Sequence, residues 1–289
     1  MVISNIIGGL GNQMFQYAAG RALSIKCGSN LQLDISGFAN YELHQGFELQ
    51  RIFNCNTEIA SKSNVRNVLG WQSLSFVRRI ILRSNMQKLR CKPFVVEPHF
   101  YYWSGIRNLT EDCYLYGYWQ SENYFVDVAA RIREDFTFKL PMQNNNAELA
   151  VHINNVNAVS LHVRRGDYVN NTTTYALCSS DYYKAAIEYI AGRVEQPHFY
   201  IFSDDIAWVK NNLKIDFPHH YVDCNHGSES YNDMRLMSLC KHNIIANSSF
   251  SWWGAWLNSS SKKIVVAPKY WFANETNIQD LMPEGWVRL

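Results

Sequence analysis

Hydrophobic and polar residues alternate along the chain in blocks that predict strands separated by helices. Near the N-terminus, an apolar run at residues 2–7 precedes a glycine-rich loop at 8–13 and a helical pattern that closes on Gly28. A second apolar run follows at residues 31–34. Short apolar runs bounded by glycine predict strands, whereas apolar residues spaced by three and four predict a helix. The chain therefore opens with a β-loop-α-β unit.

The same alternation is regular after about residue 156. Strand patterns occur at residues 158–163, 198–203, 219–223, 243–246 and 262–268, and helical patterns at 181–194, 204–213, 229–242 and 249–257. Strands and helices that alternate with short connections predict a parallel sheet covered by helices on both faces. The segment from about residue 41 to 125 is less regular and richer in aromatic residues.

A polar, asparagine-rich segment at residues 141–157 separates the two regions. It contains a proline, and polar segments of this kind are typical of domain boundaries. We therefore predict an α/β protein with two Rossmann-like domains that face a cleft. The N-terminal domain is expected to comprise residues 1–150 and the C-terminal domain residues 151–289, with the extreme C-terminus packing back on the first domain.

The composition is that of a folded protein. The chain has 289 residues, 47% of them hydrophobic, and its net charge of +2 is too small to indicate a nucleic-acid partner. No apolar run reaches the roughly 20 residues of a membrane span. The N-terminus lacks the basic region of a signal peptide, and the seven cysteines include no C-x-x-C pair. We expect a soluble cytoplasmic protein with reduced thiols.

The sequence LHVRRGDYV, residues 161–169, places two arginines at the end of a predicted strand. Side chains alternate along a strand, so His162 and Arg164 share one face. Ligands of open parallel sheets bind beyond the carboxyl ends of the strands. Arginine stays protonated, and its planar group binds phosphate through two hydrogen bonds. We predict a phosphate site here, with Arg164 as the main contact and Arg165 in the more structural role.

The same residues have two alternative interpretations. An ion pair between Arg165 and Asp167 would stabilise a tight turn at Gly166 without any ligand. The tripeptide formed by these three residues is also a cell-adhesion signal, but adhesion requires a displayed loop on a secreted protein.

The glycine-rich sequence GGLGNQM, residues 8–14, joins the first strand to the first helix, where anions and nucleotides often bind. With Asp34 it resembles a dinucleotide-binding fingerprint, but Met14 replaces the small residue that close helix packing requires. A nucleotide-dependent dehydrogenase is therefore an alternative function. We expect Asn12 and Gln13 to contact the bound ligand, with helix capping as their alternative role.

Polar residues follow two further predicted strands. Ser203 and Asp204 are candidates for the ligand site, although a helix N-cap is the alternative for Asp204 or Asp205 because adjacent aspartates point in different directions. Ser248 and Ser249 open a predicted helix, whose first N–H groups can hold anion oxygens.

Two segments contain metal-ligand residue types, and we expect neither to bind a metal. The adjacent aspartates after the strand at 198–203 lack the D-x-D spacing, and arginines can neutralise a diphosphate without a divalent ion. His219, His220, Cys224 and His226 include zinc-type ligands, but the first two alternate faces of a predicted strand.

The segment from Ile59 to Val96 contains no acidic residue. Its basic residues are interleaved with Trp71, Leu74, Phe76, Ile80, Ile81 and Leu82. A basic amphipathic segment can lie on anionic lipid. Peripheral membrane contact through residues 62–92 is therefore one interpretation, and a solvated basic face is the other.

The sequence LYGYWQSENYF, residues 115–125, mixes aromatic residues with Gln120, Glu122 and Asn123. Aromatic rings with polar edges suit the binding of a carbohydrate acceptor. An amphipathic core segment is the alternative.

Several of these motifs occur in a familiar order. GGLGNQMFQYAAGRAL, GYWQSENYF, HVRRGDY, FSDD and NSSFSWWGAWL span nearly the whole chain, and together they resemble the α-1,2-fucosyltransferases. The resemblance implies a GT-B-like fold, with an acceptor-side domain followed by a GDP-fucose-binding domain. It also implies inversion at fucose, no metal or other cofactor, and attack by the 2-hydroxyl of a β-galactoside. A bacterial enzyme of surface-glycan synthesis, such as that of O-antigen, is implied, located in the cytoplasm or at the inner face of the membrane.

The resemblance also assigns residues. Arg164 corresponds to the residue that holds the β-phosphate of the donor, and Arg165 to its partner. The other residues expected at the donor are His162 and Asp233 on the guanine, Ser248, Ser249 and Phe250 around the diphosphate, Asn12 and Gln13 in the glycine loop, and Ser203 and Asp204.

We expect a single displacement at fucose C1, in which Arg164 stabilises the charge that develops on the leaving GDP. Asp167 and Glu122 are the candidates for the general base, and Asp167 has the alternative role of holding the arginines. A carbohydrate-binding module is a further alternative, but it leaves the arginine pair unexplained.

Overall fold

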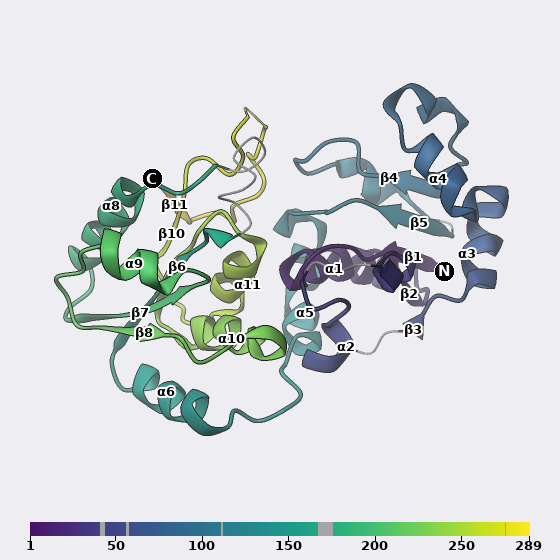
Figure 1. Cartoon of the computed structure of the whole chain (residues 1–289). Helices are drawn as coiled ribbons and strands as arrows, with labels where there is room; N and C mark the ends of the chain where they lie inside the picture. Colours follow the sequence, from purple (N-terminus) through teal and green to yellow (C-terminus); the bar gives the residue numbers. More distant parts are fainter. Residues whose placement is uncertain (41–43, 56–57, 111, 167–175, 275) are drawn as a thin grey trace. The chain divides into compact units, whose positions relative to one another are not determined.

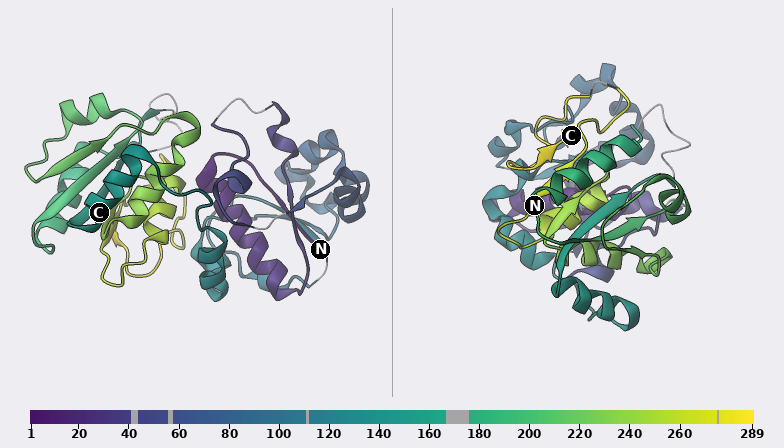
Figure 2. Two further views of the ribbon diagram at one scale, coloured as in Figure 1. Left: turned by 90° about the horizontal axis from the view of Figure 1, so that it is seen from below. Right: turned by 90° about the vertical axis from the view of Figure 1, so that its left-hand side faces the viewer.

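The computed structural model describes residues 1–40, 44–55, 58–110, 112–166, 176–274 and 276–289. The chain forms two compact units, one of Met1–Lys139 with Ile278–Leu281 and one of Leu140–Asn277 with Met282–Leu289. Each unit contains a parallel sheet with helices packed on it (Figures 1 and 2). The predicted α/β class, with two domains built on parallel sheets, is confirmed.

The sheet of the first unit has the order β3-β2-β1-β5-β4 within the described residues, and its printed pairings are all parallel. Its strands are β1 (Val2–Asn5), β2 (Leu31–Asp34), β3 (Glu58–Ile59), β4 (Phe94–Val96) and β5 (Cys113–Tyr116). Helix α1 (Leu10–Lys26) packs on the face of β1 that bears Ser4, whose hydroxyl donates to the carbonyl of Gln16. Ile3 points to the opposite face, against α3 (Lys62–Leu69) and α4 (Ser75–Ile81).

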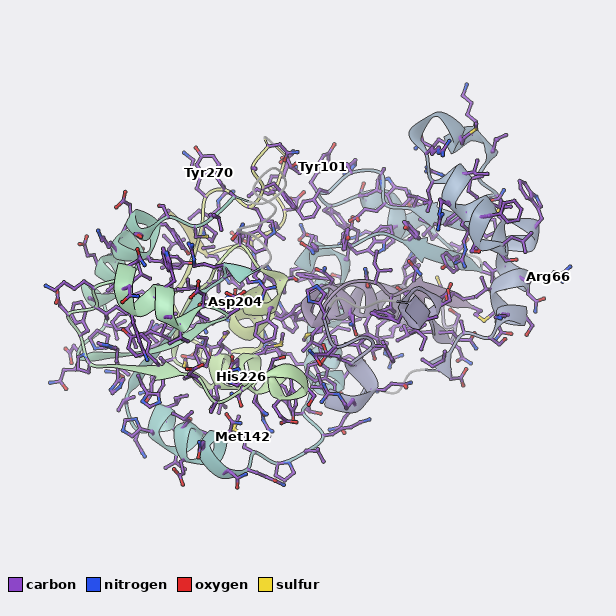
Figure 3. All side chains as sticks on the ribbon, viewed as in Figure 1. Arg66, Tyr101, Met142, Asp204, His226 and Tyr270 are labelled. Carbon is purple, nitrogen blue, oxygen red and sulfur yellow. The ribbon has the colours of Figure 1, made fainter. Side chains whose placement is uncertain are left out.

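The less regular middle of the chain consists of short helices that surround this sheet. They are α2 (Leu49–Ile52), α5 (Ala129–Asp135), η1 (Ser36–Asn40), η2 (Gly70–Ser73), η3 (Ser84–Leu89), η4 (Ser104–Asn108), η5 (Glu122–Tyr124) and η6 (Val126–Val128). Many of these span only one turn, which is too short to produce a helical period in the sequence. Arg66 extends from α3 on the outer side of this unit (Figure 3).

The second sheet has the order β11-β10-β9-β6-β7-β8 within the described residues. Its strands are β6 (Asn157–Val163), β7 (Pro197–Ser203), β8 (His219–Val222), β9 (His242–Ile244), β10 (Val265–Ala267) and β11 (Val287–Arg288). The helices of this unit are α6 (Asn144–Asn154), α8 (Ser180–Ala191), α9 (Ile206–Asn212), α10 (Tyr231–Leu239) and α11 (Ser249–Leu257), with η7 (Gly227–Glu229). The predicted alternation of strands and helices in this half of the chain is confirmed.

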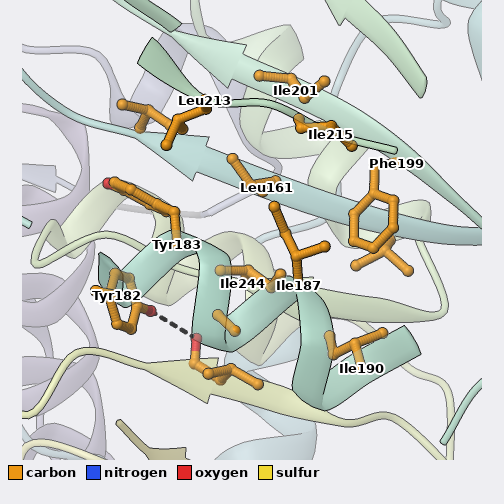
Figure 4. Packing of buried hydrophobic residues seen from close by; sticks show 14 of the residues in the cluster. Leu161, Tyr182, Tyr183, Ile187, Ile190, Phe199, Ile201, Leu213, Ile215 and Ile244 are labelled. Carbon is orange, nitrogen blue, oxygen red and sulfur yellow. Dashed lines mark hydrogen bonds between the residues drawn. The ribbon is translucent and has the colours of Figure 1, made fainter. Parts of the chain in front are cut away.

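Strand β6 is buried on both faces, which fixes the direction of its side chains. Leu161 lies in an apolar cluster with Tyr183 and Ile187 of α8 (Figure 4). Ala158 lies in a separate cluster with Leu236 of α10. Because neighbouring residues of a strand point to opposite faces, His162 is on the face of Ala158, away from α8.

The domain boundary was expected in or near the asparagine-rich segment, and in the structure most of this segment is helix α6. Leu149 and Ile153 lie four residues apart on this helix and pack against the apolar cluster that contains Leu236. The boundary between the units accordingly lies after Lys139 rather than after residue 150. The helix was not recognised in the sequence because most of its residues are polar. Its narrow apolar stripe is nevertheless sufficient to pack α6 on the second unit.

Two expectations from composition concern cysteines and membrane spans. All seven cysteines lie in the described ranges, and none forms a disulfide. Among the helices of the described residues, none has the length and apolar character required to cross a bilayer.

A buried charge network connects β2 to α4 in the first unit. The carboxylate of Asp34 accepts hydrogen bonds from the Tyr114 hydroxyl at 2.6 Å and the Arg78 guanidinium at 2.9 Å. Burial by itself would raise the pKa of Asp34, but hydrogen bonds from Tyr114, Ser36 and Arg78 outweigh it and lower the pKa. Since this carboxylate is engaged inside the unit, it is not available to a ribose hydroxyl. The dehydrogenase alternative loses the acidic residue on which it depended.

Replacing Arg78 should therefore destabilise the first unit strongly. Arg78→Met leaves Asp34 buried without its cationic partner, which is expected to cost about 3–5 kcal/mol in urea unfolding at pH 7. Arg79→Met, at the exposed neighbouring position, is the control and should change stability by no more than about 0.5 kcal/mol. Similar losses in both variants would contradict the role given to the Asp34 network.

The same network predicts a pH dependence. The pKa of Asp34 in the folded protein lies below its unfolded value of about 3.9. Its stabilisation is thus complete above the unfolded pKa and is lost as the pH falls through the folded pKa. The difference in stability between wild type and Arg78→Met should become smaller below about pH 4.

Candidate functional site

The order of the second sheet creates a position where ligands are expected. From β6 the chain adds β7 and β8 on one side, whereas β9, β10 and β11 lie on the other. Strands β6 and β9 are neighbours, so the direction of winding changes between them. Ligands of open α/β sheets bind outside the carboxyl ends of the strands at such a switch point. The residues that follow β6 and β9 are therefore the candidates for a site.

Two arginines follow β6, and one carboxylate holds both of them. Arg164 Nη1 lies 3.0 Å from Asp204 Oδ2, and the backbone N–H of Arg165 donates to Asp204 Oδ1 at 2.9 Å. The guanidinium of Arg165 lies 3.9 Å from the centre of the Trp208 ring and 3.6 Å from the carboxylate of Asp205. Stacking and ion pairing fix Arg165 on α9, whereas the side chain of Arg164 is 26% exposed at the carboxyl end of β6.

Gly166 leaves room for the Asp204 carboxylate in this arrangement. A Cβ atom at this position would lie 2.6 Å from Oδ2 of Asp204, well inside van der Waals contact. The absence of a side chain allows the Asp204 carboxylate to approach the backbone that follows the arginines. Asp167, one of the two predicted bases, lies outside the described residues.

The adjacent aspartates after β7 have different roles, as their opposite directions predicted. Asp205 is the N-cap of α9 and accepts a hydrogen bond from the N–H of Trp208 at 2.9 Å. The Ser203 hydroxyl accepts from the N–H of Asp205 at 2.9 Å. Asp204 is left for the arginines. Its contacts assign it to positioning them, so its expected part in donor binding is indirect.

His162 lies on the strand face that was predicted for it, and it is 6% exposed. Its Nδ1 has no hydrogen-bond partner among the described residues, and its ring centre is 6.0 Å from that of Phe250. Burial, and secondly the charge of Arg164, lower its pKa to about 3. The imidazole is therefore neutral near pH 7 and offers a buried polar atom next to the arginine.

The N-terminus of α11 follows β9 at the other side of the switch point. Ser248 is the N-cap, and its hydroxyl accepts from the N–H of Phe250 at 3.3 Å. Asn247 fixes the preceding turn by donating to the carbonyls of Ala176 and Trp271 at 2.6 and 2.8 Å. A helix N-terminus favours anions, because its first N–H groups and its dipole are both positive. The capping role of Ser248 is compatible with an anion at this end of α11, next to Ser249.

Asp233 lies beside a polar pocket in the second unit. Its carboxylate accepts from the Asn225 amide at 2.7 Å, and Asn225 also exchanges two hydrogen bonds with Asn146 of α6, at 2.7 and 3.0 Å. Burial raises the pKa of Asp233 to about 7, against the opposing hydrogen bond from Asn225. The pocket has a volume of about 580 Å³ and is lined by Leu140, Pro141, Gln143, Asn144, Asn145, Asn146, Cys224, Asn225, Glu229, Tyr231 and Asn232.

The first sheet has its own switch point, between β1 and β5. Helix α1 begins at Leu10, earlier than the expected residue 14, because the carbonyl of Gly9 already accepts from the N–H groups of Asn12 and Gln13. Asn12 thus lies in the first helical turn. Its side-chain oxygen accepts from the Gln120 amide at 2.7 Å, which joins the segments that follow β1 and β5.

Gln13 does not have the ligand-binding position that was expected. Its side chain is fully buried, donating to the carbonyls of Gly8 and Gly46 at 2.9 and 2.7 Å and accepting from the N–H of Glu48 at 2.9 Å. The side chain of Gln13 therefore binds the glycine loop to the start of α2. The polar atoms of its amide are used inside the protein, so we assign Gln13 a structural role.

Two acidic residues in the segments that follow β4 and β5 have different surroundings. Glu122, a predicted base, begins η5. Burial lowers the pKa of Arg133, and the charge of Glu122 partly opposes this effect. Glu97, which sequence reasoning missed, directly follows β4 and accepts from the N–H groups of Tyr118 and Trp119 at 2.7 and 3.0 Å. Burial raises the pKa of Glu97 to about 7, against the effect of these two hydrogen bonds.

One sequence signal could have pointed to Glu97. It ends the acid-free stretch that begins at Ile59, and it stands directly at the end of an apolar strand. The structure adds a steric reason for its neighbour, since a Cβ atom on Gly117 would lie 2.4 Å from the Cβ of Glu97. In the part of the chain that is described, no group of three or more His, Cys, Asp or Glu residues is arranged to hold a metal ion.

Two units, each with a parallel sheet and polar residues at its carboxyl edge, correspond to the GT-B-like class of fold. In overall fold the chain is similar to the α-1,6-fucosyltransferase NodZ, known from Bradyrhizobium, in a crystal soaked with GDP-fucose. The TM-score is 0.53 at 14% sequence identity, covering 89% of this chain and 91% of the other.

The sequence places the chain within this class. Residues 94–289 match glycosyl transferase family 11. An α-1,2-colitosyltransferase of Escherichia coli is 39% identical, covering 100% of this chain and 99% of the relative. The O-antigen biosynthesis glycosyltransferase WbnK, also from E. coli, is 35% identical over 99% of each chain. The protein belongs to glycosyl transferase family 11.

The contact between Gly166 and Asp204 can be tested by adding one methyl group. Gly166→Ala should displace Asp204 and release the side chain of Arg164, lowering kcat for sugar transfer by about 100-fold while the melting temperature changes little. Gly192→Ala is the matched control, because Gly192 has a helical backbone and its added Cβ would come no closer than 3.4 Å to a neighbour. Full activity of Gly166→Ala would show that the position of Arg164 does not depend on Asp204.

Proposed function

We propose that the protein transfers L-fucose from GDP-fucose to the 2-hydroxyl of a terminal galactose in a glycan, with inversion at fucose and without a metal ion. The observation that carries this proposal is the position of Arg164. Its guanidinium is fixed by Asp204 at the switch point of the second unit, where a diphosphate is expected to bind. A fixed cation at the departing oxygen stabilises the negative charge that appears as the bond to fucose breaks.

The surroundings of Arg164 support a guanine nucleotide as the leaving group. The N-terminus of α11, with Ser248 and Ser249, offers N–H groups to the phosphates. Asp233 has a carboxylate that accepts hydrogen bonds, which suits the N–H groups of guanine. The buried Nδ1 of His162 provides a further polar contact for the nucleotide. Asn12, in the first turn of α1, is assigned to the phosphates or the fucose.

The relatives support an α-1,2 linkage and a surface-polysaccharide product more strongly than they support fucose as the donor sugar. The names of two relatives include an α-1,2 linkage and O-antigen biosynthesis, respectively. Colitose, named for one of them, is the 3-deoxy analogue of L-fucose. A fucose donor is supported here by the fucosyltransferase motifs of the sequence. We assign the reaction to the assembly of a bacterial surface polysaccharide.

The donor can be identified by incubating the protein with a β-galactoside in EDTA and, separately, GDP-fucose, GDP-colitose, GDP-mannose or UDP-galactose. We expect product from GDP-fucose, with an α-1,2 linkage in its NMR spectrum, and a loss of kcat of about 10²–10³-fold in Arg164→Ala. Transfer of colitose alone would correct the donor. Transfer from UDP-galactose alone, or normal activity of Arg164→Ala, would overturn the proposal.

Glu97 is the carboxylate that best suits the general base of this reaction. It lies at the carboxyl edge of the acceptor-side sheet, next to the segment from Gly117 to Gln120 that was expected to contact the acceptor. Its carboxylate is oriented by two backbone N–H groups, and the pKa of about 7 allows it to accept a proton near neutral pH. Glu122 is the alternative base within the described residues.

A pH profile distinguishes the two carboxylates. The base must be ionised, so kcat/KM of the wild type should fall by about tenfold per unit as the pH decreases below 7. Glu97→Gln should lower kcat by about 10²–10⁴-fold and abolish this dependence, whereas Glu122→Gln should retain it. A normal rate and profile in Glu97→Gln would exclude Glu97 as the base.

A further inference from the structure

The excursion between β3 and β4 exposes an unusual number of large apolar side chains. They come from η2, α4, η3 and the turn between η2 and α4, and their exposed fractions are 64% for Trp71, 52% for Leu74, 63% for Phe76, 42% for Ile80 and 57% for Leu89. We call these five residues the α4 surface. Large exposed apolar groups gathered in one segment commonly mark an interaction site.

This exposure does not reflect poor packing of the segment. Val77 and Ile81 of α4 are buried against Phe94 and Tyr114 of the sheet, so α4 has a well-defined inner face. Two basic residues also face inward. Arg78 binds Asp34, and Arg90 donates to the carbonyls of Ile81 and Leu82 at 2.9 and 3.3 Å. Buried contacts therefore fix the segment between β3 and β4 on the sheet, while its α4 surface is exposed to solvent.

The charge around the α4 surface is of one sign. The segment from Ile59 to Val96 holds eight of the 27 basic residues and none of the 25 acidic ones, so its formal charge is +8 and that of the remaining residues is −6. Six of the basic side chains are exposed, namely Lys62, Arg66, Arg79, Arg83, Lys88 and Lys92. Arg79 and Ile80 lie three and four residues after Phe76 on α4, which places the three side chains on one side of the helix. Arg83 follows two residues after the end of α4.

We propose that the α4 surface docks the protein on an anionic lipid bilayer. Trp71, Phe76 and the aliphatic side chains enter the interface between headgroups and acyl chains, and the surrounding lysines and arginines bind the lipid phosphates. Aromatic and aliphatic side chains bordered by cations are the pattern of helices that lie in the membrane interface. Each basic residue close to such a surface adds attraction to the negative leaflet.

Charge complementarity favours a membrane over a second copy of the chain. Two identical α4 surfaces brought together would bring two groups of exposed cations into contact without any acidic residue from this segment to compensate them. An anionic bilayer instead provides negative headgroups for the exposed lysines and arginines and acyl chains for the apolar side chains of the α4 surface.

Vesicle binding tests the proposal with the full chain. The wild type should sediment with vesicles that contain about 30% phosphatidylglycerol, and should bind vesicles of pure phosphatidylcholine at least about tenfold more weakly. Trp71→Ser with Phe76→Ser should reduce binding to the anionic vesicles by about tenfold or more, as should Arg79→Gln with Arg83→Gln. The binding should also weaken at high salt, because the electrostatic part is screened.

Val151→Ser with Tyr270→Ser is the matched control, since these residues of the second unit are 63% and 66% exposed, like Trp71 and Phe76. This variant should bind as the wild type does. Equal binding by Trp71→Ser/Phe76→Ser and the wild type would overturn the proposal. So would a wild-type dimer in sedimentation velocity that this double variant abolishes, because the surface would then join two copies. Transfer to a soluble acceptor should be unchanged in all these variants, so vesicle binding is tested independently of the reaction.

Discussion

The hydrogen bonds and ion pair of the Asp204 carboxylate fix the polar residues at the carboxyl edge of the second sheet. One oxygen binds the backbone after β6 and the other binds the guanidinium of Arg164, so the ends of β6 and β7 are fixed to each other. A flexible arginine would have to be ordered each time an anion binds, whereas Arg164 is already held in position. Preorganised charge of this kind stabilises a transition state without reorganising the site during the reaction. The glycine that follows the arginines is needed because the same carboxylate occupies the space of its side chain.

The carboxyl edge of the first sheet is fixed in a related way. There, backbone N–H groups orient the carboxylate of Glu97, and an amide pair between Asn12 and Gln120 joins the segments after β1 and β5. In both units, parallel strands bring residues that are distant in sequence to one edge, where strand ends leave polar groups unsatisfied by the sheet. In this family 11 protein, the candidate site residues thus come from short polar segments at the strand ends, while the apolar strands behind them form the core.

The sequence predicted best those features that depend on local periodicity. The strands and helices after residue 156 and the opposite faces of Leu161 and His162 follow from burial on both sides of a parallel sheet. Helix α6 was missed because only a narrow stripe that includes Leu149 and Ile153 is apolar. Gln13 was misassigned because an amide that bonds to its own loop and an amide that binds a ligand look the same in a sequence. Glu97 was missed because its partners are backbone groups some twenty positions away, which cannot be recognised in the sequence. Its place at the end of an acid-free stretch was the one signal that marked it.

The near-neutral net charge of the chain conceals a strong internal separation of charge. Positive charge is concentrated in the Ile59–Val96 segment, and the remainder of the molecule is net negative. Such a molecule has a permanent electric dipole moment, so a charged surface exerts a torque on it in addition to a net force. Within about a Debye length, roughly 10 Å at 0.1 M salt, this torque turns the basic segment toward negative charge before any side chain makes contact. The orientation of the protein at a surface is then selected during approach rather than by trial collisions.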